Sequence, residues 1–168
     1  LVADALAAPS AGNSQGAEVL LLVGPGETAR YWDASLPAGR RDGFAFPDLL
    51  AAPVLVVVLT DPGRYVERYA EPDKAKDATG WTTPWWWVDG GMVVQRLLAG
   101  ADAAGLGRLV FGPFEQESAV RAALGIPEHL GVVAVVALGH PLPSPPGRSA
   151  GRSRRQGRVH RGGYGSPG

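Results

Sequence analysis

The residues best equipped for chemistry lie in the stretch APSAGNSQG, residues 8–16. Between Pro9 and Gln15 it places one proline, two hydroxyls and two carboxamides. A plain turn needs only two or three such residues. Hydroxyl and carboxamide groups both donate and accept hydrogen bonds, so together they suit the edge of a polar heterocycle. Ser10, Asn13 and Gln15 are therefore candidate ligand-binding residues; an ordinary turn is the alternative.

Two further stretches are unusual in composition. Four of the five Trp lie in WTTPWWW, residues 81–87. Indole rings here could form an aromatic wall beside a planar ligand or could pack in a core or interface. Residues 141–168 contain six of the 16 basic residues, all Arg, and none of the 16 acidic ones. Such a tail is a candidate for binding an anion or wrapping a partner.

Composition argues against several other classes of protein. Cys is absent, which excludes disulfides and thiolate metal sites, and the three His show no ligand spacing. No apolar run reaches the roughly 18 residues of a membrane span, and no signal peptide is recognisable. GLGRLVFG precedes a strand instead of following one, so it is no dinucleotide fingerprint. The Arg-rich tail lacks the interleaved aromatics of a nucleic-acid binder. We expect a cytoplasmic protein that contacts neither membrane nor nucleic acid.

Local patterns predict the elements that must position these residues. Apolar, often β-branched runs predict strands at residues 18–23, 53–60, 108–112 and 131–139. Helical patterns cover residues 1–8, 26–36, 61–70, 89–105 and 115–127. Alternating strands and helices favour a mixed α and β domain at residues 1–140, followed by a Pro/Gly/Arg-rich arm at residues 141–168. The helix at 89–105 is apolar on nearly all sides, which predicts a subunit interface.

The motifs together resemble the nitroreductase-like family of FMN-dependent oxidoreductases. APSAGNSQG followed by a strand is similar to the family's flavin-contacting loop. Three further segments follow in the family's order, namely EPDKA, WTTPWWWVDGGMVVQRLLAGADAAGLGRLVFG and VRAALGIPEHLGVVAVVALGHP. The segment RVHRGGYG resembles the family's C-terminal arm. The resemblance covers nearly the whole chain. It implies an α+β fold of three layers (α/β/α), a central mixed but mainly antiparallel sheet, and a homodimer.

The resemblance also implies which residues bind the cofactor. Ser10, Asn13 and Gln15 match the loop that contacts FMN, in many members from the neighbouring subunit. The strand end whose backbone lies beside the isoalloxazine matches Val110, Phe111 and Gly112. The basic positions that contact the phosphate match Arg154 and Arg155, and the substrate side matches Trp85 and Trp86. No protein nucleophile or metal is required, because FMN itself accepts the hydride.

The chain departs from the family pattern in two places. The family's opening R-x-x-R segment is absent, which predicts a truncated N-terminus, and Gly16-Ala17 replaces a common Pro-Trp. The resemblance implies hydride transfer from NAD(P)H through FMN to a nitroaromatic, quinone or similar acceptor. Two alternatives stay open. One is oxidative fragmentation of reduced FMN to dimethylbenzimidazole, and the other is a truncated, non-catalytic protein that binds flavin or only dimerises.

Overall fold

A four-stranded antiparallel sheet forms the centre of the molecule, with strand order β1-β2-β4-β3. The computed structural model describes all residues except 75, 114–115, 144–150, 154–157 and 165–168. The strands are β1 (Ala17–Val23), β2 (Val54–Thr60), β3 (Gly107–Phe111) and β4 (Gly131–Gly139). All four lie within a residue of the predicted positions, because each is a mainly apolar run bounded by Gly, Pro or Asp.

Every pairing between these strands is antiparallel, whereas the resemblance predicted a mixed sheet. The connection between β1 and β2 shows the reason. It returns the chain to the end of the sheet at which β1 finished, so that Val23 pairs with Val54. A parallel neighbour would instead need a crossover to the opposite end.

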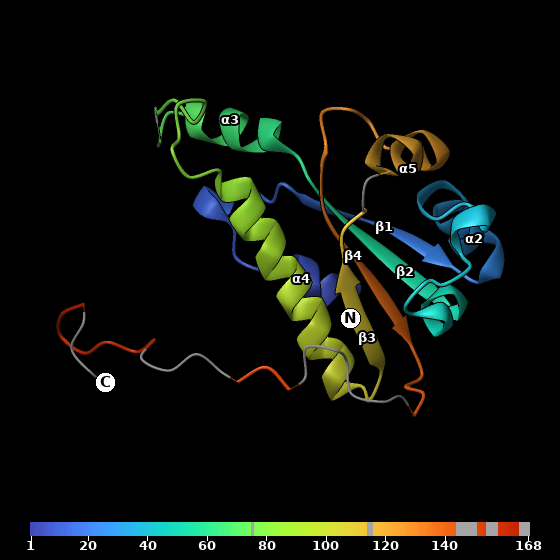
Figure 1. Cartoon of the computed structure of the whole chain (residues 1–168). Coiled ribbons are helices and arrows are strands. Elements are labelled where there is room, and N and C mark those ends of the chain that lie inside the picture. The colour runs from blue at the N-terminus through green and yellow to red at the C-terminus, as the bar shows by residue number, and fades with distance from the viewer. Residues whose placement is uncertain (75, 114–115, 144–150, 154–157, 165–168) are drawn as a thin grey trace.

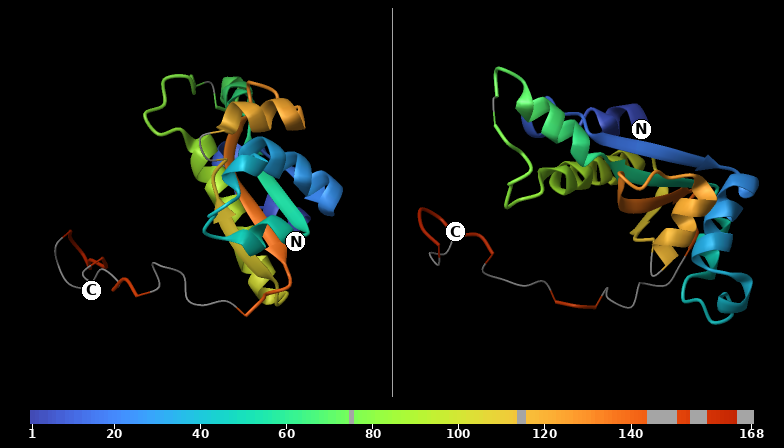
Figure 2. Two further views of the ribbon diagram at one scale, coloured as in Figure 1. Left: turned by 45° about the vertical axis from the view of Figure 1, so that its right-hand side comes forward. Right: turned by 90° about the horizontal axis from the view of Figure 1, so that it is seen from above.

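Helices cover both faces of the sheet and complete three layers (Figures 1 and 2). The α-helices are α1 (Val2–Leu6), α2 (Pro25–Ser35), α3 (Pro62–Ala70), α4 (Trp85–Ala103) and α5 (Glu117–Leu124). Short 3-10 helices lie at η1 (Ala11–Asn13), η2 (Ala38–Arg40) and η3 (Pro47–Ala51). Among the described residues, no helix has the length and apolar character needed to cross a membrane.

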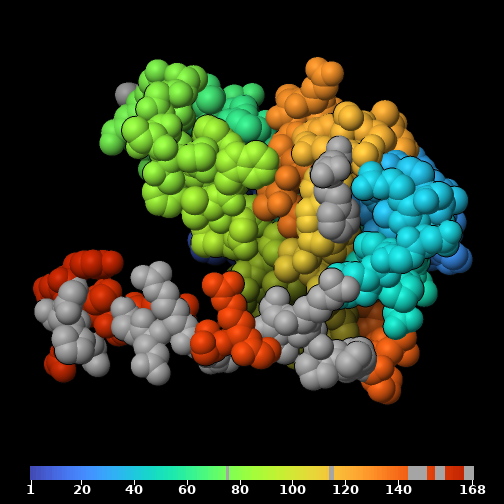
Figure 3. Space-filling view, viewed as in Figure 1, coloured from blue at the N-terminus to red at the C-terminus, as the bar shows by residue number. Residues whose placement is uncertain are grey.

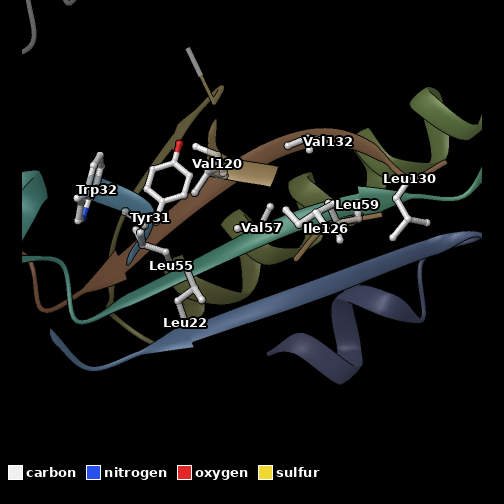
Figure 4. Packing of buried hydrophobic residues seen from close by; sticks show 12 residues of the cluster. Leu22, Tyr31, Trp32, Leu55, Val57, Leu59, Val120, Ile126, Leu130 and Val132 are labelled. Carbon is white, nitrogen blue, oxygen red and sulfur yellow. The ribbon is translucent and has the colours of Figure 1, made fainter. Parts of the chain in front are cut away.

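Alternation along β2 separates two apolar cores. Leu55, Val57 and Leu59 face α2 and α5, and Figure 4 shows this cluster with Tyr31 and Trp32 of α2. Val56 and Val58 point the other way, toward α1 and α4. Successive strand residues face opposite sides of a sheet, so a continuous apolar strand requires cover on both faces.

The long helix α4 begins at Trp85, four residues before the predicted start at Asp89. Pro84 precedes its first turn, and tryptophan tolerates a helix well enough for this turn to form. Within one chain only one side of α4 is covered, and it consists of Asp89, Gly90, Val93, Val94, Leu97 and Ala101. Trp85, Trp87 and Val88 remain 43%, 42% and 42% exposed.

The described parts of residues 141–168 extend along and beyond the body (Figure 3). Val159 is 72% exposed and Tyr164 is 93% exposed. Arg154 and Arg155, the predicted phosphate ligands, lie outside the described residues. The arm therefore contributes little to the core of its own chain through the residues that the structure describes.

Candidate functional site

The polar loop at residues 10–15 adopts a strained backbone. Gly12, Asn13 and Gln15 have φ angles of 63°, 57° and 51°, in the left-handed region. For a residue other than glycine this conformation costs about 1–2 kcal/mol, somewhat less for Asn. The backbone N–H of Gln15 donates to Ser10 Oγ at 2.9 Å, which closes the loop. Non-glycine residues keep such a conformation where their surroundings enforce it, often at functional sites.

Side chains from α3 and α4 hold this loop in place. The backbone N–H of Ala11 donates to Asp89 Oδ2 at 2.8 Å, and the Tyr65 hydroxyl donates to the same oxygen at 2.9 Å. Arg68 Nε donates to the carbonyl of Gly12 at 2.8 Å. Burial, and then the hydrogen bond to Asp89, raise the pKa of Tyr65 well above its usual value. Its phenol therefore stays protonated and remains a donor at neutral pH.

The carboxamides of Asn13 and Gln15 point into solvent instead of bracing the loop. Both residues are exposed, and within the part of the chain that the structure describes neither side chain forms a hydrogen bond. Ser10, in contrast, uses its hydroxyl inside the loop. The loop thus presents two free donor and acceptor groups on a rigid backbone, which is the arrangement expected of a site for a polar planar ligand.

A cluster of aromatic side chains packs against the loop at Gly12. The Tyr69 ring packs edge-on against Trp81 with centroids 4.5 Å apart, and Trp86 lies 6.1 Å from Tyr65. The Tyr69 ring also lies against Gly12, where a Cβ would come within 2.7 Å of Cε2. Of the two predicted substrate-side residues, Trp86 is half-buried in this cluster and Trp85 is 43% exposed on the surface of α4.

The second predicted cofactor region lies at the end of β3. Val110 is 43% exposed and Gly112 is exposed, so both are open to a ligand. Phe111 faces inward, where its ring stacks on Trp32 with centroids 5.6 Å apart. Among the described strands β3 pairs with β4 alone, so it forms one edge of the sheet.

The structure does not bring these two regions together in one chain. β1, which follows the polar loop, and β3 form opposite edges of the sheet (Figure 1). β2 and β4 lie between them, so the edges are about 14 Å apart, three interstrand spacings. Within one chain the two predicted cofactor regions therefore lie at separate edges of the sheet.

Sequence reasoning missed Asp89, Arg68 and Tyr65, which position the loop. One signal was available: Asp89 is an acidic residue at the start of a predicted helix whose other residues are mostly apolar. A charge at such a position is rarely fully buried unless it is hydrogen-bonded. Asp89 is 2% exposed, which marks it as a residue with a specific partner. Nothing in the local sequence indicated that this partner lies 78 positions away.

An antiparallel sheet between two helical layers, beside a braced polar loop, defines an α+β protein of the nitroreductase-like class. The model of the Nitroreductase family matches residues 1–140, and the chain belongs to that family. This confirms the family predicted from the sequence. No curated protein is similar enough to count as a relative.

Solved structures support the fold at low sequence identity. A nitroreductase family protein from Clostridium novyi NT is 21% identical with a TM-score of 0.61, over 84% of this chain and 70% of that one. A Desulfovibrio desulfuricans protein, solved in complex with FMN, is 22% identical with a TM-score of 0.62, over 94% and 77%. A Bacteroides fragilis protein is 20% identical with a TM-score of 0.66; the match covers 86% of this chain but only 56% of that protein.

Proposed function

We propose that this protein is an FMN-dependent oxidoreductase that transfers hydride from NAD(P)H to a nitroaromatic, quinone or similar acceptor. The observation that carries the proposal is the strained polar loop, which presents the side chains of Asn13 and Gln15 without hydrogen-bond partners among the described residues. Family membership supports it, as does the relative that was solved with FMN. FMN supplies the hydride-accepting ring, and the protein supplies position and electrostatics.

The residues present fit this cofactor by their chemistry. A carboxamide offers both a carbonyl and an N–H₂ group, which complement the alternating carbonyl and N–H groups of a flavin pyrimidine edge. The backbone at Val110 and Gly112 would lie beside the ring, because both residues are exposed on an open strand edge. Arg154 and Arg155 would pair with the phosphate, as guanidinium groups bind it through charge-assisted hydrogen bonds.

A complete site on this proposal needs two copies of the chain. The polar loop and the end of β3 lie on opposite sheet edges, so one flavin contacts both only if they come from different subunits. The exposed start of α4, with Trp85, Trp87 and Val88, is a suitable interface because these side chains are apolar and lie next to the loop. The proposed assembly is a homodimer.

The test begins with the absorption spectrum of the purified full chain. We expect a bound flavin spectrum, and NAD(P)H oxidation that depends on an added nitroaromatic or quinone. The matched control is Asn13→Gly with Gln15→Gly, because glycine keeps the left-handed backbone and removes only the carboxamides. A colourless protein that gains no flavin spectrum on titration with FMN contradicts the proposal. Formation of dimethylbenzimidazole from reduced FMN and oxygen would assign the other activity instead.

A further inference from the structure

We propose that Asp89 is a positioning residue, which together with Arg68 holds the polar loop in its left-handed conformation and so sets the affinity for flavin. The flavin part of this inference rests on the proposed function; the part that concerns loop order does not. Asp89 lies under the loop and would act without touching the ligand.

The geometry places opposite charges on opposite sides of the loop. From α4, the carboxylate of Asp89 accepts a hydrogen bond from the N–H of Ala11 at 2.8 Å. From α3, the guanidinium of Arg68 donates to the carbonyl of Gly12 at 2.8 Å. The two bonded peptide groups lie on either side of the pair Ala11 and Gly12, and Gly12 is the first left-handed residue. Charge-assisted hydrogen bonds are roughly twice as strong as neutral ones, so this pair of contacts restrains the backbone at the turn.

The burial of Asp89 indicates that its carboxylate has specific hydrogen-bond partners. Its side chain forms no ion pair within the residues that the structure describes, and the residue is only 2% exposed. Its Oδ2 receives both the Ala11 N–H and the Tyr65 hydroxyl. A carboxylate in such surroundings is unfavourable unless its hydrogen bonds compensate. One of these hydrogen bonds comes from the loop itself, through Ala11, and the other comes from Tyr65 of α3, the helix that packs against the loop.

Loss of the carboxylate would release the strain of the loop. Asn13 and Gln15 are held at φ of 57° and 51°, and a loop freed from Asp89 can relax to ordinary φ values. Their carboxamides would then adopt many orientations, and flavin binding would have to order them again. Preorganisation of this kind raises affinity without adding a contact.

The experiment compares Asp89→Ala, Asp89→Asn and a control, Asp102→Ala. Asn is isosteric, and its single carbonyl oxygen can accept both bonds that Oδ2 now accepts. Asp102 lies on the same helix, with its side chain 54% exposed and paired with Arg108 far from the loop. Two readouts are taken on the full chain: hydrogen–deuterium exchange of the peptide at residues 8–17 without FMN, and the FMN dissociation constant from fluorescence quenching.

We expect Asp89→Ala to accelerate exchange in this peptide and to weaken FMN binding by about tenfold, equivalent to ~1.4 kcal/mol. Asp89→Asn should restore both readouts to within about threefold of the original protein, and Asp102→Ala should leave them unchanged. Exchange and affinity unchanged in Asp89→Ala would overturn the proposal. An Asp89→Asn protein as impaired as Asp89→Ala would also overturn it, because the acceptor oxygen that Asn keeps would then have no part in ordering the loop.

A second variant covers the case in which Asp89→Ala does not fold. Arg68→Met removes the donor to Gly12 from the other side of the loop, where the Arg68 side chain is 22% exposed. It should accelerate loop exchange in the same direction, and unchanged exchange would count against the proposal. If the original protein binds no FMN while the exchange differences hold, the proposed function fails and the positioning role of Asp89 stands.

Discussion

The polar loop at residues 10–15 and the end of β3 at residues 110–112 offer different surfaces to a ligand. The loop is a strained segment held by charged side chains from two helices, and it exposes polar groups. The β3 end is regular strand, held by backbone pairing to β4, and it exposes the apolar side chain of Val110. The loop is suited to hydrogen bonding with polar groups of a ligand, and the β3 end is suited to packing against the face of a ring.

The positions of the two regions bear on whether the protein acts as a dimer. Because the two regions occupy opposite sheet edges, the proposed flavin site takes them from two different chains. In the proposed homodimer, a twofold axis would bring the loop of one copy to the strand of the other. On this view the dimer interface and the flavin site are the same feature.

The largest expected effect comes from mixing two defective chains. Asn13→Gly/Gln15→Gly disables the loop, and Val110→Arg places a bulky charge on the exposed strand end. Each homodimer should hold under about a tenth of the normal FMN. A heterodimer of the two should recover about half of the sites, because one of its two sites combines an intact loop with an intact strand.

The FMN content of purified heterodimers, isolated with two different affinity tags, checks this expectation. Each homodimer, isolated with one tag, is the control. A heterodimer as empty as either homodimer would mean that the loop and the strand of one chain serve the same site.

Next in size is the effect of the arm. Arg154→Ala/Arg155→Ala should weaken FMN binding by at least about tenfold, since each charge-assisted bond to a phosphate is worth roughly 1.5–3 kcal/mol. Arg40→Ala, an exposed arginine of the body, is the matched control and should leave affinity unchanged. Fluorescence-quench titrations measure the change. Equal affinities would show that the phosphate site lies elsewhere.

A smaller effect is expected from glycines that differ in their surroundings. Gly12 has a φ of 63°, and a Cβ there would come within 2.7 Å of the Tyr69 ring. Gly12→Ala should lower the free energy of unfolding by about 1–3 kcal/mol, through strain and overpacking. Gly26→Ala, in α2 with no atom within 4 Å of the new Cβ, should be neutral or slightly stabilising. Urea denaturation compares them, and equal losses would contradict the strain of the loop.

The smallest effect concerns pH and the core behind β3. Tyr31 packs edge-on against Phe111, and burial raises its pKa to about 12. The folded state therefore keeps this proton after the unfolded state releases it, near pH 10. Stability should be unaffected by Tyr31 below about pH 10 and should fall as the pH rises from there toward 12. Tyr31→Phe should remove that part of the slope in urea denaturation; an unchanged slope would contradict it.

Strand positions could be predicted from the sequence because each strand is locally distinct. The runs that became β2 and β4 are apolar on both faces, and a strand of that kind must lie in the centre of a covered sheet. The start of α4 was predicted incorrectly, since the tryptophan run gave no periodic signal before Asp89. The antiparallel direction of every pairing was also not readable, because direction depends on where connections return.

Part of the candidate site could likewise be predicted. Ser10, Asn13 and Gln15 were selected by residue type, and the structure shows Asn13 and Gln15 exposed and Ser10 engaged in the loop. The bracing by Asp89 and Arg68 could not be predicted. Hydrogen bonds between residues 78 and 56 positions apart depend on how helices pack, and no local pattern encodes that distance.

The sequence by itself determined the elements, the alternation of the core and the polar character of the loop, since these follow from side-chain type and spacing along a short segment. Only the tertiary structure decided the left-handed backbone of the loop and the buried position of Asp89. It alone also separated the loop from β3 by the width of two strands. The reason is physical: conformational strain and burial are properties of packed surroundings, and those surroundings come from distant parts of the chain.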